Sequence, residues 1–423
     1  MQKASTKRMS LLIVCALLTA TGVGVWIYQI TQGLAITGMN NGSSWGLYIA
    51  CFMFFVGLSA GGLIVASSAS VFGVRDFKKV SRPAVLLSTV CIIAAAAFIL
   101  IDLGGIQRVF NLIIHPNLTS PLMWDVIVIS VYLLINLVYL VLLRKPDEQR
   151  SARALAITSR FALPVAILVH SVTAWIFGLE IAKAGWYSAI MAPLFVSSAL
   201  DSGLALLLVV LVVLNAARLF ETSRKLIASL AGLLAVFIAV DAFMVLSEII
   251  TMAYPGAPEE AFVLAELTRG TMAPWFWFQV IGGLVVPFLL LVFSRLREKT
   301  PVVVVASTLV VLGVFCKRIW LLLTSFIEFN VSGAPGLAFG RAERTATETW
   351  TLVGTYSPTW AELLITLGVL ALAVLVYTLL APRLFGTLPT HALHDDDSTE
   401  RHARADVLLD GPQAAAGTQA EVG

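Results

Sequence analysis

Long apolar stretches alternate with short polar segments along most of this chain. A helix that spans a bilayer needs about 20 mainly apolar residues. Stretches of this kind recur ten times, separated by charged residues, Gly and Pro. The pattern predicts ten spanning helices, at residues 10–31, 46–72, 84–105, 122–143, 159–182, 188–217, 227–253, 273–294, 302–326 and 360–381.

The second stretch, WGLYIACFMFFVGLSAGG from Trp45, contains a distinctive group of small residues. Its Trp and Tyr favour a membrane interface. Gly57 and Gly61 are four residues apart, so on a helix they share one face and allow another backbone to come close. We expect this helix to pack tightly inside a bundle.

Composition and charge place the chain in the membrane. Hydrophobic residues make up 59% and charged residues 13% of the chain, whereas a soluble domain has about 25% charged residues. Lys and Arg concentrate in alternate connections, which predicts a protein of the cytoplasmic (inner) membrane with both termini cytoplasmic. The predicted outer connections hold only Arg108, Lys183, Arg269, Arg341 and Arg344.

The chain is expected to divide into four parts. Residues 1–9 form a cytoplasmic N-terminus, and residues 10–182 hold helices one to five. Residues 183–385 hold helices six to ten, and residues 386–423 are a polar, disordered cytoplasmic tail. The longest outer connection is expected at residues 327–359.

Ionisable side chains inside predicted spans are candidate functional groups, because each costs about 2.5–3.5 kcal/mol at mid-bilayer. Lys317 or Arg318 paired with Glu248 or Glu362 would be a buried ion pair. His170 and Asp201 lie at comparable depth and would make a proton-transfer step. The full set is Asp102, Asp125, His170, Glu180, Asp201, Asp241, Glu248, Lys317, Arg318 and Glu362.

No resident metal or haem is expected in this chain. The cysteines form no C-x-x-C pair, and no metal-ligand spacing is present. A bis-histidine haem needs paired histidines on spanning helices, and His170 is the only histidine well inside a predicted span.

The outer ends of the first helices carry groups that suit a quinone. Gln29 and Gln32 close helix one, Trp124 and Asp125 open helix four, and Tyr132 lies about two turns deeper. A quinone head needs a hydrogen-bonding group at each carbonyl. Oxidation of a quinol also releases two protons, so carboxylates or His must be near.

Several stretches together resemble the NrfD/PsrC family, the integral-membrane subunits of polysulfide, nitrite and related reductases. They are GLAITGMNNGSSWGLYIACFMFFVGLSAGG, IDLGGIQRVFNLIIHPNLTSPLMWD, HSVTAW, APLFVSSALDSG and TYSPTWAE. The resemblance implies an all-α protein in which helices two to five and six to nine form two four-helix bundles, with helices one and ten flanking. It also implies a menaquinol- or quinol-reactive anchor without haem.

Partners and site residues follow from the same resemblance. It implies a ferredoxin-like iron–sulfur subunit at the outer face and a catalytic subunit, usually molybdopterin-dependent; no nucleic-acid partner is expected. Tyr132 matches the position expected to bind the quinone, with Gln32, Trp124 and Arg108 nearby. The Gly57/Gly61 face would let the first bundle close around the quinone.

One motif departs from the family. Many members read Asp-Leu-Gly-Arg-Pro where this chain reads DLGGI from Asp102, and Arg108 follows as a possible substitute for the missing arginine.

Proton handling is expected from four residues, and the second bundle holds either a proton path or static ion pairs. The proton-handling set is Asp102, Asp125, His170 and Asp201; the second-bundle set is Asp241, Glu248 and Arg318.

The main hypothesis is therefore a respiratory oxidoreductase subunit whose terminal substrate is handled by another chain. Two alternatives stay open. One is a secondary transporter, although Pro164 and Pro287 do not form the matched broken helices typical of transporters. The other is a purely structural anchor without a working quinone site.

Overall fold

The computed structural model describes residues 2–40, 42–71, 75–144, 151–327 and 356–385. Its described part is all-α, and ten of its helices are long and apolar enough to span a membrane, as the hydrophobic pattern predicts. The spanning elements are α1 (Gln2–Gln32), α2 (Leu47–Val71), α3 (Ser81–Asp102), α5 (Pro121–Arg144), α6 (Ala152–Gly178), α7 (Met191–Ala216), α8 (Arg224–Ala253), the run α10 (Ala273–Trp277), η5 (Phe278–Val285) and α11 (Val286–Val292), α13 (Thr300–Ile327) and α14 (Trp360–Phe385).

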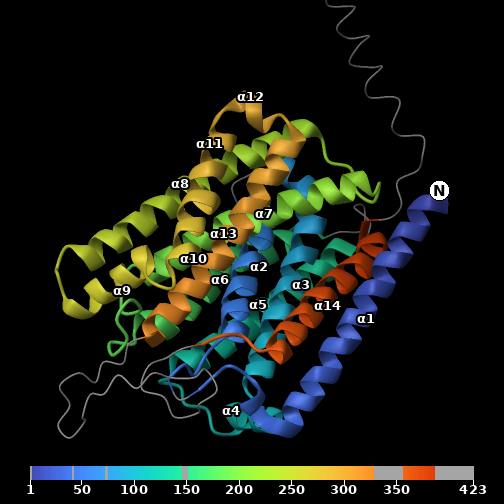
Figure 1. The fold of residues 1–423 in the computed structure, drawn as a ribbon. Helices are drawn as coiled ribbons and strands as arrows, with labels where there is room; N and C mark the ends of the chain where they lie inside the picture. The colour runs from blue at the N-terminus through green and yellow to red at the C-terminus, as the bar shows by residue number, and fades with distance from the viewer. Residues whose placement is uncertain (1, 41, 72–74, 145–150, 328–355, 386–423) are drawn as a thin grey trace, which may run out of the picture.

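Short helices form the connections at the two ends of the molecule (Figure 1). We call the end that carries α4 and α9 the outer end, following the charge distribution. The short elements are η1 (Gly33–Ile36), η2 (Arg75–Val80), η3 (Ile106–Phe110), α4 (Asn111–Ile114), α9 (Pro258–Arg269) and α12 (Ser294–Arg297). The predicted tail at 386–423 and most of the predicted loop at 327–359 lie outside the described residues.

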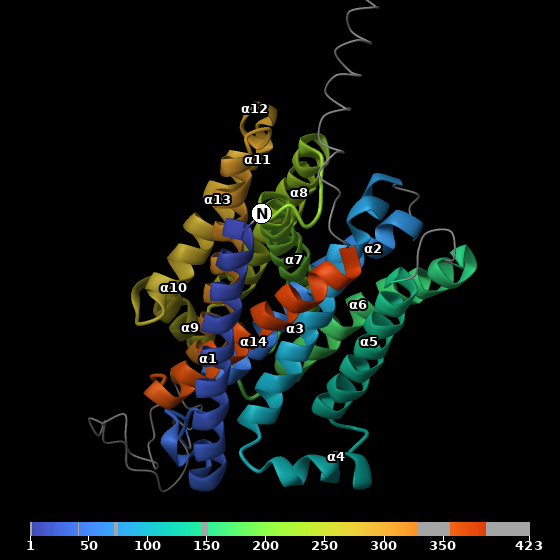
Figure 2. The ribbon, with the colours of Figure 1, turned by 90° about the vertical axis from the view of Figure 1, so that its right-hand side faces the viewer.

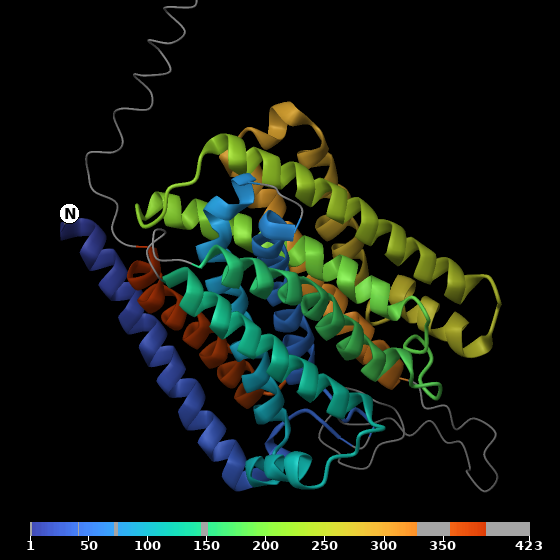
Figure 3. The same ribbon diagram turned by 180° about the vertical axis from the view of Figure 1, so that it is seen from behind.

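The spanning helices form two groups that match the expected bundles. Helices α2, α3, α5 and α6 pack together, and α7, α8, α13 and the α10–η5–α11 run form the second group. Helices α1 and α14 lie side by side at one edge, with α14 against α3 (Figures 1 and 3). Figure 2 shows α14 crossing in front of α3, with α1 beside it, and α4 at the outer end of the first group.

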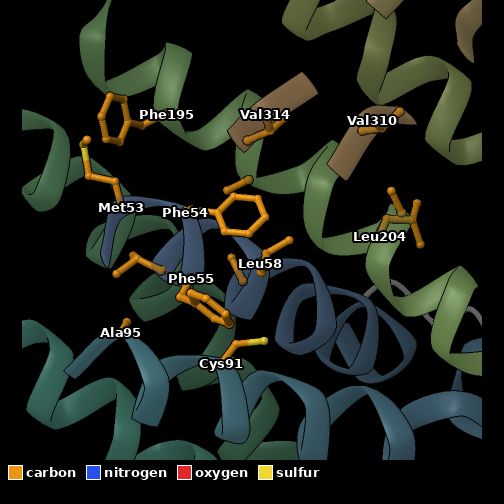
Figure 4. Packing of buried hydrophobic residues seen from close by; sticks show 14 of the residues in the cluster. Met53, Phe54, Phe55, Leu58, Cys91, Ala95, Phe195, Leu204, Val310 and Val314 are labelled. Atoms are coloured by element: carbon orange, nitrogen blue, oxygen red, sulfur yellow. The ribbon is translucent and has the colours of Figure 1, made fainter. Parts of the chain in front are cut away.

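Helix α2 is the shared core of the two bundles. Residues 50–67 are all buried, because α3 and α6 cover one side of the helix and α7 and α13 cover the other. Phe54 extends toward Val310 and Val314 of α13, whereas Phe55 extends toward Cys91 of α3 (Figure 4). A helix that is apolar all round is expected in such a position.

The two bundles come into close contact at two glycines. A Cβ built on Gly61 of α2 would lie 2.3 Å from the carbonyl carbon of Gly203 on α7. The backbones are therefore in direct contact, which only small residues permit. The expectation that this glycine face closes the first bundle on itself is wrong, because the face joins the first bundle to the second. Gly62, one residue on, faces α3 instead.

The eighth span differs from the single regular helix that its sequence predicts. Residues Phe278–Val285 form a π-helix between two α-helical segments. Gly283 in this segment meets Gly313 of α13, where an added Cβ would lie 2.7 Å from the Cα of Gly313. The π-helical segment therefore carries a second glycine–glycine backbone contact. The hydrophobic pattern gives no sign of this change, because it predicts only that the segment is mostly apolar, and its sequence FQVIGGLV satisfies that in either helix type.

The glycine contact predicts a sharp difference between two substitutions on one helix face. Gly61→Ala should lower the stability of the purified protein by about 1–3 kcal/mol, because its methyl group overlaps the backbone of α7. Gly57→Ala is the matched control, since its Cβ would lie 3.7 Å from the nearest atom, an ordinary contact. Thermal unfolding in detergent measures both. Equal melting temperatures for the two variants would contradict the close α2–α7 packing.

Candidate functional site

Buried polar groups meet at the outer ends of α1, α2 and α3. The Gln29 side chain is 1% exposed and donates from Nε2 to the carbonyl oxygen of Ile101, at 3.1 Å. The Tyr48 hydroxyl donates to Oε1 of Gln29 at 2.7 Å. Asp102 follows Ile101 as the last residue of α3; it is partly exposed, yet its Oδ1 is enclosed and has no hydrogen-bond partner among the described residues. We call Gln29, Tyr48 and Asp102 the outer polar cluster.

The other predicted quinone residues are spread over the outer end. Gln32 is exposed at the end of α1, and Arg108 is exposed in η3. The Trp124 indole donates from Nε1 to the carbonyl oxygen of Leu118, at 2.6 Å, and so fastens the connection before α5. These side chains come from three different elements, and no hydrogen bond among the described residues joins them to one another. Sequence reasoning weighed Gln29 beside Gln32, but it read Tyr48 only as an interfacial aromatic.

Tyr132 lies deep in the first bundle. Its side chain is fully buried, and its hydroxyl is 2.9 Å from the hydroxyl of Ser88. Ser59 of α2 donates to the same hydroxyl at 3.3 Å. Asn136, one turn inward, donates from Nδ2 to the carbonyl oxygen of Tyr132. Three helices thus share one buried hydrogen-bonded group with Tyr132 at its centre.

Two of the predicted proton-handling residues lie near each other at the α5–α6 contact. Asp125 is 2% exposed and accepts a hydrogen bond from Thr173 at 2.6 Å. His170 lies one turn inward of Thr173 on α6 and is 1% exposed. Its Nε2 has no hydrogen-bond partner within the described residues. Asp125 is therefore held in place, whereas His170 has a free hydrogen-bonding position.

The second bundle contains a buried ion pair that sequence reasoning assigned to the wrong partners. Lys317 Nζ lies 2.8 Å from Oδ1 of Asp241, and both side chains are fully buried. Ser197 of α7 donates to the same oxygen at 2.7 Å. Glu248, two turns further out on α8, instead accepts from the Ser188 hydroxyl at 2.9 Å. Asp241 is thus the anion that compensates the charge of Lys317.

Arg318 contacts α7 rather than Glu248 or Glu362. Its Nη2 donates to the hydroxyl of Ser198 at 2.7 Å, and its guanidinium lies 4.0 Å from the centre of the Phe195 ring. Neither carboxylate oxygen of Asp201, one turn from Ser198 on α7, has a hydrogen-bond partner among the described residues. Arg318 and Asp201 are both fully buried.

A small cavity lies beside Glu248 at the outer end of the second bundle. Its lining includes Met252, Trp320 and Thr324, and its volume is ≈ 10 Å³. A cavity of about 10–15 Å³ accommodates one water molecule. This cavity is therefore far too small for a quinone head.

Glu362 has a structural role that sequence reasoning missed. Its carboxylate accepts from the backbone N–H of Thr359, while Thr359 Oγ1 accepts from the backbone N–H of Glu362, the reciprocal pair of a capping box. The same carboxylate accepts from Gly38 N–H at 2.8 Å and from the Tyr356 hydroxyl. The Thr-x-x-Glu spacing before an apolar run is the sequence signature of a capping box, and it was the signal that could have predicted this role of Glu362.

Tyr356 completes this connection between the start of α14 and the segment before α2. Its hydroxyl oxygen accepts from the backbone N–H of Leu47 at 2.7 Å. Burial, followed by the negative charge of Glu362, raises the pKa of Tyr356 well above its usual range. The hydroxyl therefore stays protonated and keeps donating to the Glu362 carboxylate.

The described residues contain no group of three or more His, Cys, Asp or Glu side chains that could hold a metal ion. Two histidines are described: His115 is exposed after α4, and His170 is buried within α6. They lie in different environments and do not form a pair of haem ligands. The absence of haem and metal stays a prediction.

Comparison with known proteins now decides the family. The family model described as polysulphide reductase, NrfD, matches residues 35–330. The chain belongs to the NrfD family. This confirms the predicted family, and with the ten apolar helices it makes the chain a multi-pass integral membrane protein. The matched region of this NrfD protein runs from η1 to α13, so both bundles lie within it.

Two archaeal relatives align along most of the chain. A protein of Halobacterium salinarum, named as a candidate membrane subunit of a dimethyl sulfoxide reductase, is 36% identical over 86% of this chain and 88% of its own length. The Hdr-like menaquinol oxidoreductase integral membrane subunit of Archaeoglobus fulgidus is 29% identical over 90% of this chain and 95% of its own.

A third relative bears on the haem prediction. A candidate b-type cytochrome subunit of Ni/Fe-hydrogenase 2 from Escherichia coli is 24% identical over 92% of this chain and 93% of its own length. Its name mentions a haem protein, but His115 and His170 of this chain do not provide a pair of axial ligands. The described residues therefore do not fit a bis-histidine haem.

Removing the Glu362 carboxylate should loosen the outer end of α2. We expect Glu362→Ala to destabilise the segment around Gly38 and Leu47 by about 1–3 kcal/mol, because partly buried donors lose their acceptor. Hydrogen–deuterium exchange of the peptides covering residues 37–47 measures the effect. Glu259→Ala is the control, since Glu259 is exposed on α9. Unchanged exchange in the Glu362 variant would refute this role.

Proposed function

We propose that this NrfD-family protein is the quinol-reactive membrane subunit of a multi-subunit oxidoreductase. It exchanges electrons between a membrane quinol and an iron–sulfur partner at the outer face, and a further subunit, molybdopterin-dependent in our hypothesis, handles the terminal substrate. Family membership supports this proposal, as does an alignment over nearly the whole length of a relative named as a menaquinol oxidoreductase membrane subunit. Menaquinol is therefore the first quinol to test.

The outer polar cluster is the proposed position of the quinone head. The observation that carries this assignment is the enclosed Asp102 Oδ1, which lacks a partner among the described residues although the side chain is partly exposed. Buried polar atoms are almost always hydrogen-bonded, so an unpaired carboxylate oxygen suits a donor that arrives from outside the protein. A quinol hydroxyl is such a donor. Gln29 and Tyr48 keep the neighbouring backbone in place through their bonds to each other and to Ile101.

The chemistry requires two electrons and two protons to leave the quinol. In the proposed mechanism the electrons pass one at a time to the iron–sulfur partner, and Asp102 accepts a proton from the quinol hydroxyl. Because Asp102 is partly exposed at the outer end of α3, this proton can leave on the outer side. Asp125, His170 and Asp201 are proposed to handle protons deeper in the protein. The reverse reaction, reduction of a quinone, uses the same groups.

Gln32, Arg108, Trp124 and Tyr132 stay predictions as quinone contacts. Gln32 and Arg108 are exposed and free to orient toward a bound head group or toward the partner. Tyr132 would first have to exchange its bonds to Ser59 and Ser88 for a bond to the quinone. We therefore propose that Tyr132 acts mainly by organising the first bundle, and that Asp102 contacts the quinol.

The two alternative functions predict different properties of the purified complex. A purely structural anchor would carry no extractable quinone and would show no quinol-dependent electron transfer. A secondary transporter would purify without an iron–sulfur partner. The names of the relatives, a candidate reductase subunit and a menaquinol oxidoreductase subunit among them, favour the redox role over transport.

Replacing the proposed proton acceptor should slow quinol oxidation without preventing assembly. Asp102→Asn should lower the rate by about 100-fold or more, because a general base contributes factors of this size. Glu180→Gln is the control, since Glu180 is an exposed carboxylate at the same end of the protein. Stopped-flow oxidation of a menaquinol analogue by the purified complex measures both. A wild-type rate in the Asp102 variant would contradict the assignment of Asp102 as the proton acceptor.

Tyr132→Phe tests the competing position for the quinone. The substitution removes a hydroxyl bonded to two serines, so we expect reduced thermal stability with an unchanged KM for the quinol. Steady-state kinetics at several quinol concentrations separate the two positions. A several-fold rise in KM, with stability unchanged, would instead place the quinone head at Tyr132.

A further inference from the structure

The connection between α3 and α5 lies at the outer end of the first bundle. It contains η3 (Ile106–Phe110) and the short helix α4 (Asn111–Ile114), which Figure 2 shows running transverse to the spanning helices. Its helical part packs mainly through α4 against η3, and through η3 against α3. No residue of η3 or α4 is buried. The connection therefore contributes little to the core of the bundle, and its surface is available for another contact.

Large apolar side chains are exposed on this connection. Phe110, Ile113 and Ile114 have the spacing of one helix face, and they are 62%, 74% and 64% exposed. Leu118 follows, also 64% exposed. We call these four residues the outer apolar patch. Burying a side chain of this kind fully is worth about 1.5–3 kcal/mol, so four of them within one short connection indicate a surface that is covered by something apolar.

The outer apolar patch continues into the lipid-facing surface of α5. Trp124, in the first turn of α5, donates from Nε1 to the carbonyl oxygen of Leu118 at 2.6 Å, which holds Leu118 against the start of that helix. Leu122 is exposed in the same turn, and Val131 and Leu134 are exposed further along α5. Exposed apolar side chains in the middle of a spanning helix face acyl chains. The patch therefore extends a surface that already contacts lipid.

The charge of the connection also favours lipid as its neighbour. Between Asp102 and Asp125 the sequence contains no Asp or Glu, and Arg108 is its only formal charge. A docking surface for another protein usually has a polar rim around its apolar centre. A short apolar helix with a Trp beside it is instead typical of the membrane interface, where the apolar face enters the boundary between headgroups and acyl chains.

The other helix at the outer end, α9 (Pro258–Arg269), has the opposite arrangement. Its apolar Val263 and Leu267 are buried, and the helix packs on α8, α10 and α13 of the second bundle. Glu259 and Arg269 are exposed. Helix α9 thus turns its apolar side inward, as a helix in contact with water does, whereas η3 and α4 turn theirs outward. The two helices are therefore built for different surroundings.

We propose that the outer apolar patch is inserted into the outer leaflet of the bilayer, at the boundary between lipid headgroups and acyl chains. Residues 106–118 then form an interfacial segment that lies in the plane of the membrane. This insertion fixes the depth of the outer end of α3, because only Leu103, Gly104 and Gly105 separate η3 from that helix. The lipid contact does not depend on the proposed quinol function. Only its corollary, that Asp102 lies within reach of a quinol dissolved in the lipid, rests on that function.

Photocrosslinking in the assembled complex identifies what covers the patch. The complex, with p-benzoylphenylalanine in place of Ile113, is reconstituted in vesicles of phosphatidylcholine and phosphatidylglycerol and irradiated. Mass spectrometry of the peptide should then detect a lipid adduct. The same group in place of Leu134 is the positive control, because Leu134 is exposed midway along α5. In place of Glu259, which is exposed on α9, it should give no lipid adduct.

The outcomes separate lipid from protein neighbours. Lipid adducts at Ile113 with a yield comparable to that at Leu134 would support the proposal. Adducts with an iron–sulfur partner or with a second copy of this chain would overturn it, and so would the absence of any adduct, as expected at Glu259. Ile114 and Leu118 are exposed members of the same patch and give the same information if the Ile113 variant does not assemble.

The unmodified complex provides a second test that needs no variant to fold. A lipid-soluble aryl diazirine, activated by light within the vesicles, should label the side chains of the outer apolar patch as it labels Leu134, and should leave α9 unlabelled. Labelling of α5 without labelling of the patch would overturn the proposal. Neither test measures quinol turnover, so failure of the proposed function would appear separately, as a wild-type rate in Asp102→Asn.

Discussion

The direct backbone contact between Gly61 and Gly203 determines how the two bundles relate. Within a membrane, helices gain nothing from leaving lipid, so association depends on close packing and on buried polar bonds. With glycine on both sides, α2 and α7 approach until their main chains touch. Helix α2 thereby becomes the core of the whole protein, and α13 is brought close enough for Arg318 to reach Gly57.

The same helix borders three of the polar groups described above. Tyr48 at its outer end bonds Gln29 in the proposed quinone site. Ser59 in the middle bonds Tyr132 of the first bundle. Gly57 lies between Tyr48 and Ser59 along the helix, and it leaves room for the guanidinium of Arg318 from the second bundle. A single buried helix therefore links the quinone position at the outer face with the proton-handling groups at mid-membrane.

Much of the fold could be predicted from the sequence, because membrane insertion requires long apolar segments and biases charge between the two sides. Ten spans follow from that requirement alone. The rotation of each helix about its axis does not follow from that requirement. Helix α2, for example, is apolar on every side, so no polar face shows which side meets which neighbour. The Gly57/Gly61 face was for this reason assigned to the first bundle, although it contacts the second.

The candidate site was predictable in its residue types but not in its pairings. Gln29 and Gln32 are three residues apart, and only the structure shows which of them bonds Tyr48. Lys317 required an acidic partner, and depth along the helices favoured Glu248 or Glu362; the structure instead pairs it with Asp241, which α8 places against α13. Glu362 was expected to pair with Lys317 or Arg318, because its actual donors are backbone N–H groups and a tyrosine hydroxyl that carry no charge to mark them in the sequence.

The central claim is that a quinol binds at the outer ends of α1, α2 and α3. Photolabelling of the purified complex with an azido-menaquinone, followed by mass spectrometry of the peptides, tests it most directly. We predict that the label is found near Gln29, Tyr48 and Asp102, and that excess menaquinol prevents the labelling. Label confined to α7, α8 and α13, or labelling that excess menaquinol leaves unchanged, would contradict the account.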